Sequence, residues 1–183
     1  MILTRETILK LIKKGDLHIE PFDESLIEED SILLQVSPLH ATIVKEYDEI
    51  EIREVGHHIT NYMLRQIYRY NRGRIVLEPN TVTLTITEQY ITLPRNVAGF
   101  ITIRSTFARM GILVPKVSYI HCGWNGRVVM PLVNMSPITI KIQPGTKMFQ
   151  LILVKCDKKI DKICGRYMGQ MEIMPPQLKQ EDF

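Results

Sequence analysis

A strict two-residue alternation over residues 81–87, TVTLTIT, is the feature that most constrains the fold. In an extended chain Val82, Leu84 and Ile86 point to one face and the threonines to the other, which is typical of a β-strand. Similar apolar runs, AGFITIR and ITIKI, lie further along the chain. In QPGT, Pro144 and Gly145 occupy the central positions of a type II turn. Short strands separated by tight turns predict a mainly β protein, built as a barrel or jelly roll.

The first residues predict a short N-terminal helix instead, LTRETILKLIKKG at residues 3–15. Thr4 is the expected N-cap, Leu3 and Ile8 are expected to pack together, and Gly15 ends the helix. A basic and aromatic stretch within residues 47–74 suits either a helix or a pair of strands. We expect a single domain over residues 1–165, followed by a C-terminal lid or tail over residues 166–183.

Length and composition are those of an ordinary globular protein. The chain has 183 residues, of which 45% are hydrophobic and 23% charged, enough for one domain with a full core. A net charge of +3 is too small to indicate nucleic acid and slightly favours anionic ligands. No apolar stretch approaches the roughly 20 residues of a membrane span, and no signal-peptide pattern opens the chain. We therefore expect a cytoplasmic protein without a membrane partner.

General chemical motifs are few. Cys122, Cys156 and Cys164 form neither an even set nor a CxxC pair, so reduced thiols are expected. No four-ligand spacing suited to a metal ion is present. The chain also lacks GxGxxG and P-loop sequences, so those two routes to nucleotide binding are unsupported.

One polar cluster interrupts apolar sequence in RSTFARMGILV, residues 104–114. Arg104, Ser105, Thr106 and Arg109 would cost free energy if they were buried without partners. Two explanations follow: the arginines form structural salt bridges or contacts between subunits, or they meet an anionic ligand.

Three longer segments resemble the dCTP deaminase branch of the trimeric dUTPase superfamily, in order and spacing. They are LEPNTVTLTITEQYITLPRNVAGFITIRSTFARMGI (77–112), HCGWNGRVVMPLVNMSPITIKIQPGTKMFQLIL (121–153) and RYMGQ (166–170). With the N-terminal segment, the resemblance covers nearly the whole chain. The glycine-rich C-terminal motif of dUTPases is absent, which favours the deaminase branch.

The resemblance implies a distorted β-barrel with jelly-roll-like strands, of the dUTPase-like type. It also implies a homotrimer with active sites at the subunit interfaces. The implied ligand is a deoxynucleoside triphosphate: dCTP, with dUTP and dTTP as alternatives, carrying Mg²⁺ on its phosphates. Zinc is not implied, and the sequence pattern of zinc deaminases is absent here.

The resemblance also assigns roles to residues. Arg104, Ser105 and Thr106 match the phosphate-binding triplet, and Arg109 matches the arginine near the reacting base. By the same resemblance, the phosphates are also assigned to Gln150. The base and sugar are assigned to Ser118, Tyr119 and Trp124, which match or neighbour the family's motifs. The lid is assigned to Arg166, Tyr167 and Gln170. For Tyr119 and Trp124, core packing is the alternative, and for the lid residues a disordered tail.

The catalytic positions depart from the family pattern. Pro131 stands where the family has the glutamate that shuttles protons, and a proline there requires a strand edge or bulge. His121 and Cys122 replace an aspartate-containing pair, and Leu33 stands where an aspartate is expected. His121 is the remaining candidate for a base, because imidazole titrates near neutral pH.

These observations leave three functions open. The first is hydrolytic deamination of dCTP to dUTP and ammonia, which Pro131 puts in doubt. The second is a nucleotide-binding or structural trimer that has lost catalysis. The third is a dUTP diphosphatase, in which His121 would have to position the attacking water.

Overall fold

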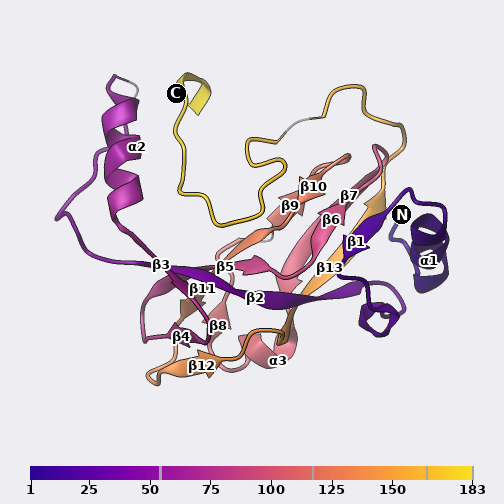
Figure 1. Ribbon diagram of the computed structural model, residues 1–183, viewed down its shortest axis with the longest axis horizontal. Helices are drawn as coiled ribbons and strands as arrows, with labels where there is room; N and C mark the ends of the chain where they lie inside the picture. The colour runs from indigo at the N-terminus through magenta and orange to yellow at the C-terminus, as the bar shows by residue number, and fades with distance from the viewer. Residues whose placement is uncertain (54, 117, 164, 183) are drawn as a thin grey trace.

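Strands carry most of the fold, in a computed structural model that describes residues 1–53, 55–116, 118–163 and 165–182. The largest sheet is antiparallel and curls into a half-barrel (Figure 1), in the order β8-β11-β5-β2-β13-β7-β9, with β3 added beside β2. Its strands are β2 (Ile32–Ile43), β3 (Tyr68–Arg72), β5 (Val82–Thr87), β7 (Val97–Ile103), β8 (Ile112–Leu113), β9 (Ser118–Ile120), β11 (Val129–Asn134) and β13 (Lys147–Lys155). The predicted mainly β architecture is confirmed.

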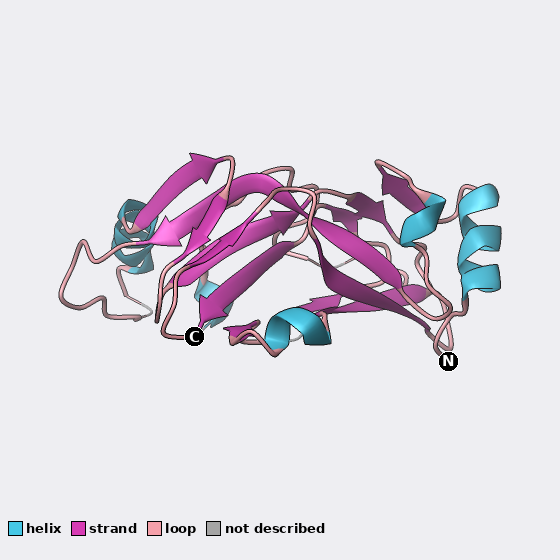
Figure 2. Cartoon of the chain, turned by 90° about the horizontal axis from the view of Figure 1, so that it is seen from below, coloured by secondary structure: helices cyan, strands magenta, loops and turns pink. Residues whose placement is uncertain are grey.

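Two small sheets and short helices complete the described chain. One sheet joins β1 (His18–Glu20), β6 (Tyr90–Thr92) and β10 (Asn125–Gly126), and the other joins β4 (Ile75–Leu77) and β12 (Ile140–Ile142). The helices are α1 (Arg5–Lys13), α2 (His57–Gln66), α3 (Ser105–Ala108) and the 3₁₀ turns η1 (Glu24–Leu26) and η2 (Gln180–Asp182). Helices α1 and α2 lie at opposite ends of the molecule (Figures 1 and 2). No helix of the described residues is long and apolar enough to cross a membrane.

The alternating segment forms β5, as predicted, but both of its faces are covered. Thr83, Thr85 and Thr87 are fully buried. The Thr85 hydroxyl donates to the Met130 carbonyl (2.8 Å), and the Thr87 hydroxyl donates to the Gln89 carbonyl (2.9 Å). These two bonds offset the cost of burying the Thr85 and Thr87 hydroxyls, whereas the buried Thr83 hydroxyl has no hydrogen-bond partner among the described residues.

A single large core fills the half-barrel. Its fully buried large side chains are Phe149, Ile8, Leu17, Ile32, Leu34, Ile75, Leu77, Ile91, Ile101, Ile112 and Met130. A second, smaller cluster joins Ala41, Tyr68 and Ile86 to Ile173 of the C-terminal segment. The C-terminal segment therefore packs on the sheet instead of extending away from it.

The predicted N-terminal helix is present as α1. Leu3 and Ile8 are both buried in the large core, as the expected packing requires. Thr4 occupies the N-cap position, although its side chain makes no capping hydrogen bond. Gly15 has φ +75° and its N–H bonds the Ile12 carbonyl (2.9 Å), so the helix ends where glycine tolerates the left-handed conformation. The ambiguous stretch within 47–74 divides into a helix, α2, followed by a strand, β3.

Candidate functional site

A hollow with a volume of about 520 Å³ lies among the described residues. Strands β9 and β11 and the loop between β9 and β10 form one side, and the C-terminal segment after residue 165 forms the other. Its lining residues are Tyr68, Leu84, Lys116, Ser118, Tyr119, His121, Trp124, Val128, Val129, Pro131, Gly165, Arg166, Tyr167, Gln170, Met174 and Pro176. The structure thus brings together the expected base and sugar residues, His121, Pro131 and the expected lid residues. We call this hollow the main cavity.

Strand β9 directs the aromatic wall of the main cavity. Ser118 is buried opposite Ile101 of β7, while Tyr119 is exposed. The Tyr119 ring lies 5.3 Å from the Phe100 ring and 4.8 Å, edge-on, from the His121 ring, between centroids. Although Tyr119 is exposed, desolvation of its hydroxyl raises its pKa above the usual value.

A tight loop after β9 fixes Trp124. Gly123 has φ +72°, and the Trp124 N–H bonds the His121 carbonyl (3.1 Å). The indole Nε1 donates to the Gly126 carbonyl (3.2 Å), and the side chain is buried. Trp124 therefore forms a rigid wall with its polar atom already satisfied.

The lid motif is docked on this loop by its backbone. Gly169 N–H donates to the Asn125 carbonyl (2.8 Å), and Arg127 N–H donates to the Gln170 carbonyl (2.9 Å). The Gln170 amide donates back to the Arg127 carbonyl (2.9 Å). Gly126 has φ +135°, and a Cβ there would lie 3.2 Å from the Gln170 backbone, so glycine permits this approach.

Arg166 is the cation on the lid side of the main cavity, and acidic residues of the same chain hold it. Its guanidinium nitrogens lie 2.8 and 2.9 Å from the Asp182 carboxylate and 3.0 Å from Glu181. These hydrogen bonds, that of Asp182 first, raise the Arg166 pKa further above its normal value. In turn the Arg166 hydrogen bond lowers the pKa of Asp182.

Pro131 lies in β11 at a place where the strand has one neighbour. It stands opposite Leu84 of β5, whereas β8 pairs with β11 only at Val133 and Asn134. The missing N–H of proline therefore interrupts no ladder between described strands, in agreement with the predicted edge position. Because Pro131 lines the main cavity, the position that the family resemblance gives to a glutamate faces the candidate site.

The expected phosphate-binding residues lie elsewhere, at the one-turn helix α3. Arg104 precedes this helix and donates from its guanidinium to the Lys147 carbonyl (3.1 Å). Ser105, Thr106 and Arg109 are exposed. Among the described residues, neither arginine pairs with a carboxylate, and the Arg109 side chain has no hydrogen-bond partner. None of these four residues lines the main cavity of its own chain.

Gln150 also lies apart from the main cavity. Its amide nitrogen donates to the Ser31 hydroxyl (2.8 Å) and approaches the Glu28 carboxylate (3.2 Å). These contacts within the chain occupy both amide hydrogens. Gln150 links β13 to the residues before β2 in this structure.

Cys122 lies in the loop between β9 and β10, and its neighbour in sequence His121 lines the main cavity. Cys122 and Cys156 are free thiols with sulfurs 3.0 Å apart, and Cys164 lies outside the described residues. Burial, with the Cys156 contact second, raises the pKa of Cys122 from its ordinary value of 9.0 to about 11. Within the described part of the chain, no three histidine, cysteine, aspartate or glutamate side chains gather as metal ligands.

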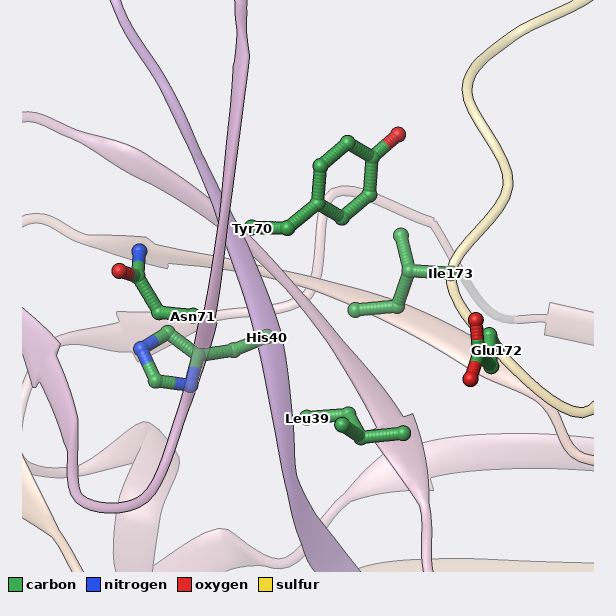
Figure 3. A pocket seen from close by; sticks show the side chains of 6 residues that line it. All are labelled: Leu39, His40, Tyr70, Asn71, Glu172 and Ile173. Atoms are coloured by element: carbon green, nitrogen blue, oxygen red, sulfur yellow. The ribbon is translucent and has the colours of Figure 1, made fainter.

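A smaller hollow of about 290 Å³ is lined by residues of β2, β3 and the C-terminal segment. Figure 3 shows Tyr70, Leu39 and Ile173 on one side of these strands and His40 with Asn71 on the other. The buried His40 ring is bonded to the Pro38 carbonyl (3.1 Å). None of the residues predicted for the site lies here.

Sequence reasoning missed several residues of the main cavity. Lys116 follows a proline in GILVPKVSYI, and its position just before β9 gave the one available signal. Tyr68 belongs to the stretch that suited both a helix and strands. Met174 and Pro176 lie in a segment without periodicity, so only the folded structure reveals that they close the cavity.

Comparisons with known proteins give a matching family and relatives that cover nearly the whole chain. A family described as dCTP deaminase-like matches residues 2–156. The dCTP deaminase of Caldivirga maquilingensis is 35% identical, with 96% of each chain covered. The dCTP deaminase of Pyrobaculum aerophilum is 29% identical, with 99% of each covered.

A solved structure shares the fold. The crystal structure of 2′-deoxycytidine 5′-triphosphate deaminase from Agrobacterium tumefaciens superposes with a TM-score of 0.63 at 16% identity. The superposition covers 83% of this chain but only 46% of that one, so this chain spans about half of its length.

Proposed function

Because this chain belongs to the dCTP deaminase-like family, we propose that it binds dCTP and deaminates it hydrolytically to dUTP and ammonia. One observation carries the proposal. The loop before β10, strand β11 and the lid motif, far apart in sequence, line one cavity of about 520 Å³. That volume falls within the range of small-molecule sites.

The cytosine and deoxyribose are assigned to the main cavity. Its walls offer the apolar surfaces that a nucleoside needs, with Tyr119 and Trp124 as aromatic faces. Ser118 and Gln170 contribute hydroxyl and amide groups that can bond to the polar edge of the base. Gln170 already uses its amide to hold the lid, so its contribution includes closing the site.

The triphosphate is assigned to the motif at α3. Guanidinium groups without carboxylate partners suit phosphate oxygens, which accept charge-assisted hydrogen bonds. Arg104 and Arg109 do not line the main cavity of their own chain. We therefore propose a homotrimer in which the α3 motif of one subunit meets the main cavity of its neighbour, with Mg²⁺ carried on the nucleotide phosphates.

His121 is the proposed proton acceptor. Of the described residues that line the main cavity, none is an aspartate or glutamate, while His121 contributes an imidazole. Deamination adds water to C4 and then breaks the C4–N bond, so one group must take a proton from water and return it to the leaving ammonia. Imidazole can do both near neutral pH.

Binding without turnover is the second candidate, and Pro131 favours it. A proline ring at that position carries no group that accepts a proton. In this case dCTP raises the melting temperature of the protein by binding only to the folded state, while no ammonia is released.

One assay separates these outcomes. Purified protein is incubated with dCTP and Mg²⁺, and ammonia, dUTP and pyrophosphate are measured. Deamination predicts ammonia and dUTP in equal amounts, with loss of both in His121→Asn. A melting-temperature shift without ammonia leaves the second candidate. Pyrophosphate release from added dUTP without ammonia release from dCTP, or no response to any nucleotide, overturns both.

Mixed trimers test whether sites are shared. Arg104→Gln and Tyr119→Ala chains are prepared separately, where each is expected to bind dCTP weakly. Unfolded together and refolded, they form some trimers in which an intact α3 motif faces an intact cavity. Recovery of tight dCTP sites supports the shared arrangement, and its absence from verified mixed trimers contradicts it.

A further inference from the structure

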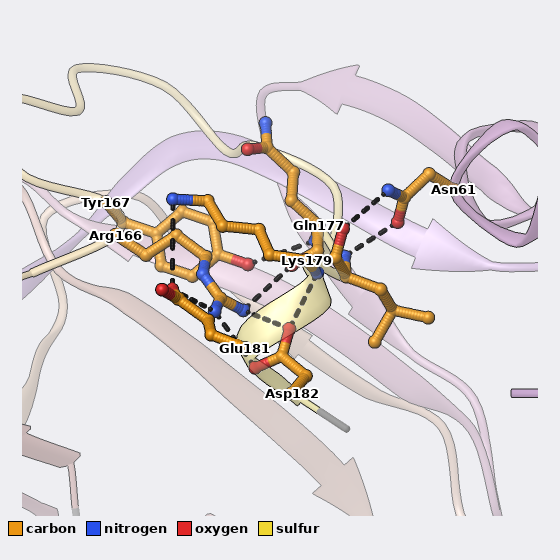
Figure 4. A network of polar contacts seen from close by, with 8 residues as sticks. Asn61, Arg166, Tyr167, Gln177, Lys179, Glu181 and Asp182 are labelled. Atoms are coloured by element: carbon orange, nitrogen blue, oxygen red, sulfur yellow. Dashed lines mark hydrogen bonds and ion pairs between the residues drawn. The ribbon is translucent and has the colours of Figure 1, made fainter. Parts of the chain in front are cut away.

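The last residues of the chain return to the lid side of the main cavity. Figure 4 shows Glu181 and Asp182 beside the Arg166 guanidinium, which contacts their carboxylates at 2.8–3.0 Å. The Arg166 side chain is 23% exposed, and it lines the main cavity. Two carboxylates of the same chain therefore pair with a guanidinium group that belongs to the proposed nucleotide site.

Two further contacts hold the returning segment. The Asn61 amide of α2 donates to the Leu178 carbonyl (2.9 Å), and its oxygen accepts the Leu178 N–H (2.7 Å). The Gln177 N–H donates to the Tyr167 hydroxyl (3.2 Å), and Tyr167 is another lid residue of the main cavity. Asn61 is thus a positioning residue, which gives the α2 segment a role in presenting the C-terminal carboxylates.

The contacts at Arg166 fit an anion that can be exchanged. Carboxylate and phosphate oxygens use the same forked geometry on a guanidinium group. The two terminal nitrogens of Arg166 are bonded, but its Nε is buried without a partner among the described residues. The Glu181 side chain is 69% exposed, so water competes with its contact. The internal carboxylates thus satisfy the guanidinium incompletely.

We propose that Glu181 and Asp182 form an internal anion that occupies the Arg166 subsite in the ligand-free chain, and that a phosphate group of the nucleotide displaces them. The inference rests on the proposed function for the identity of the ligand, but the subsite itself is tested with inorganic tripolyphosphate. Displacement would release the hydrogen bonds of Leu178 and Gln177, so ligand binding and loosening of the C-terminal segment are the same event.

Removing the two negative charges should strengthen anion binding. In Glu181→Gln/Asp182→Asn we expect the dissociation constant for tripolyphosphate, measured by calorimetry, to fall about fivefold, because competing ion pairs of this exposed kind are weak. The matched control is Glu46→Gln/Asp48→Asn, which changes the net charge equally but breaks the exposed pairs with Arg69 and Lys45. Equal affinities of the two double variants overturn the proposal.

Hydrogen exchange measures the displacement directly. In the wild-type chain, tripolyphosphate should speed amide exchange over residues 177–182, where the Leu178 N–H bonds Asn61 and the Lys179 N–H bonds Asp182 (2.8 Å). In Arg166→Gln these amides should exchange rapidly before any ligand is added and should not respond to it. Saturating tripolyphosphate without faster exchange in the wild type, or no binding of tripolyphosphate, overturns the proposal.

The two proposals fail in different ways. If tripolyphosphate releases the C-terminal segment while dCTP neither binds nor reacts, the proposed function is wrong and the subsite stands. If dCTP is bound or deaminated while exchange over residues 177–182 stays unchanged, the function stands and the internal anion is wrong.

Discussion

The two arginine groups of the candidate site differ in how the chain treats them. Arg166 lies against the main cavity and is held by two carboxylates of its own chain. Arg104 and Arg109 lie at α3, and no carboxylate among the described residues pairs with either. A guanidinium group that the fold itself neutralises keeps an ion-pair partner when no ligand is bound. One that it leaves unpaired depends on a ligand or a neighbouring subunit for its partner.

The backbone near Arg166 also differs from the backbone near Arg104 and Arg109. The lid residues are tied to the loop around Trp124 by hydrogen bonds from Gly169, Arg127 and Gln170. Helix α3 is a single turn with its hydroxyl residues exposed. The cavity side is therefore built by the single chain, whereas the α3 side presents groups outward.

The largest effect is expected from restoring a carboxylate on the cavity side. In Pro131→Glu, the new side chain would enter a cavity that has no acidic lining residue among those described. A correctly placed general base contributes at least about 100-fold, so ammonia release from dCTP should rise by that factor or more. The edge position of residue 131 tolerates the regained N–H.

Val133→Glu is the matched control for that variant. Val133 lies two residues further along β11, on the same face of the strand, but does not line the main cavity. Its dCTP turnover should equal that of the wild type. Equal turnover in Pro131→Glu and Val133→Glu, with both chains folded, would contradict the placement of residue 131 beside the reacting base.

Much of the fold could be predicted because its pattern is local. The alternation of residues 81–87 specifies β5, and Gly15 ends α1 through its own backbone preference. Burial of the threonine face could not be predicted, because it depends on carbonyls of Met130 and Gln89 brought there by other segments. Likewise, helix and strand patterns overlapped within 47–74, and only the pairing of β3 with β2 decides the second half.

In the candidate site, too, some features could be predicted from the sequence, and others depend on contacts between distant segments. The family resemblance assigns Tyr119 and Trp124 to the base and sugar and Gln170 to the lid, and all three line one cavity. No periodic pattern in the sequence indicates that Glu181 and Asp182 return to Arg166. Their return depends on the two hydrogen bonds between Asn61 of α2 and the backbone of Leu178. The contact between the α3 motif of one subunit and the main cavity of another stays a prediction. It concerns two chains, and the sequence of one chain does not specify how two copies are placed relative to each other.

Thiol labelling compares the accessibility of the buried Cys122 with that of an exposed position on α3. Cys122 has its pKa raised to about 11 from 9.0, mainly by burial, so the folded chain holds this proton more tightly than the unfolded chain. At pH 8.5, iodoacetamide, which attacks thiolates, should label Cys122 about a hundredfold more slowly in the folded chain than in urea, judged by mass spectrometry. The stabilisation from the bound proton is present below pH 9 and is lost as the pH rises toward 11.

Ser105→Cys supplies the exposed reference for this probe. A thiol on α3 should react in the folded chain nearly as fast as in urea, because residue 105 is exposed. Similar protection of Cys122 and of the new thiol would show that the two sides do not differ in access, and would remove this part of the comparison.

A smaller effect is expected for the phosphate contacts. In Arg104→Gln the dissociation constant for dCTP should rise about tenfold, the loss of one charge-assisted hydrogen bond. Arg72→Gln, which removes a charge from an exposed position of β3, is the control for overall electrostatics. Titration by calorimetry at two salt concentrations measures both, and equal weakening in the two variants would contradict a specific role for Arg104.

The smallest expected effect concerns stability on the α3 side. Because the Arg109 side chain has no partner among the described residues, Arg109→Gln should change the free energy of unfolding by less than about 0.5 kcal/mol. Arg5→Gln is the opposite case, since Arg5 bonds the Glu24 carboxylate (2.7 Å) and the Ile27 carbonyl, and should cost about 1 kcal/mol. Urea unfolding of both variants, at a protein concentration held constant, measures the difference. An Arg109 variant that loses more than the Arg5 variant would mean that a neighbouring subunit already occupies the α3 side in the ligand-free protein.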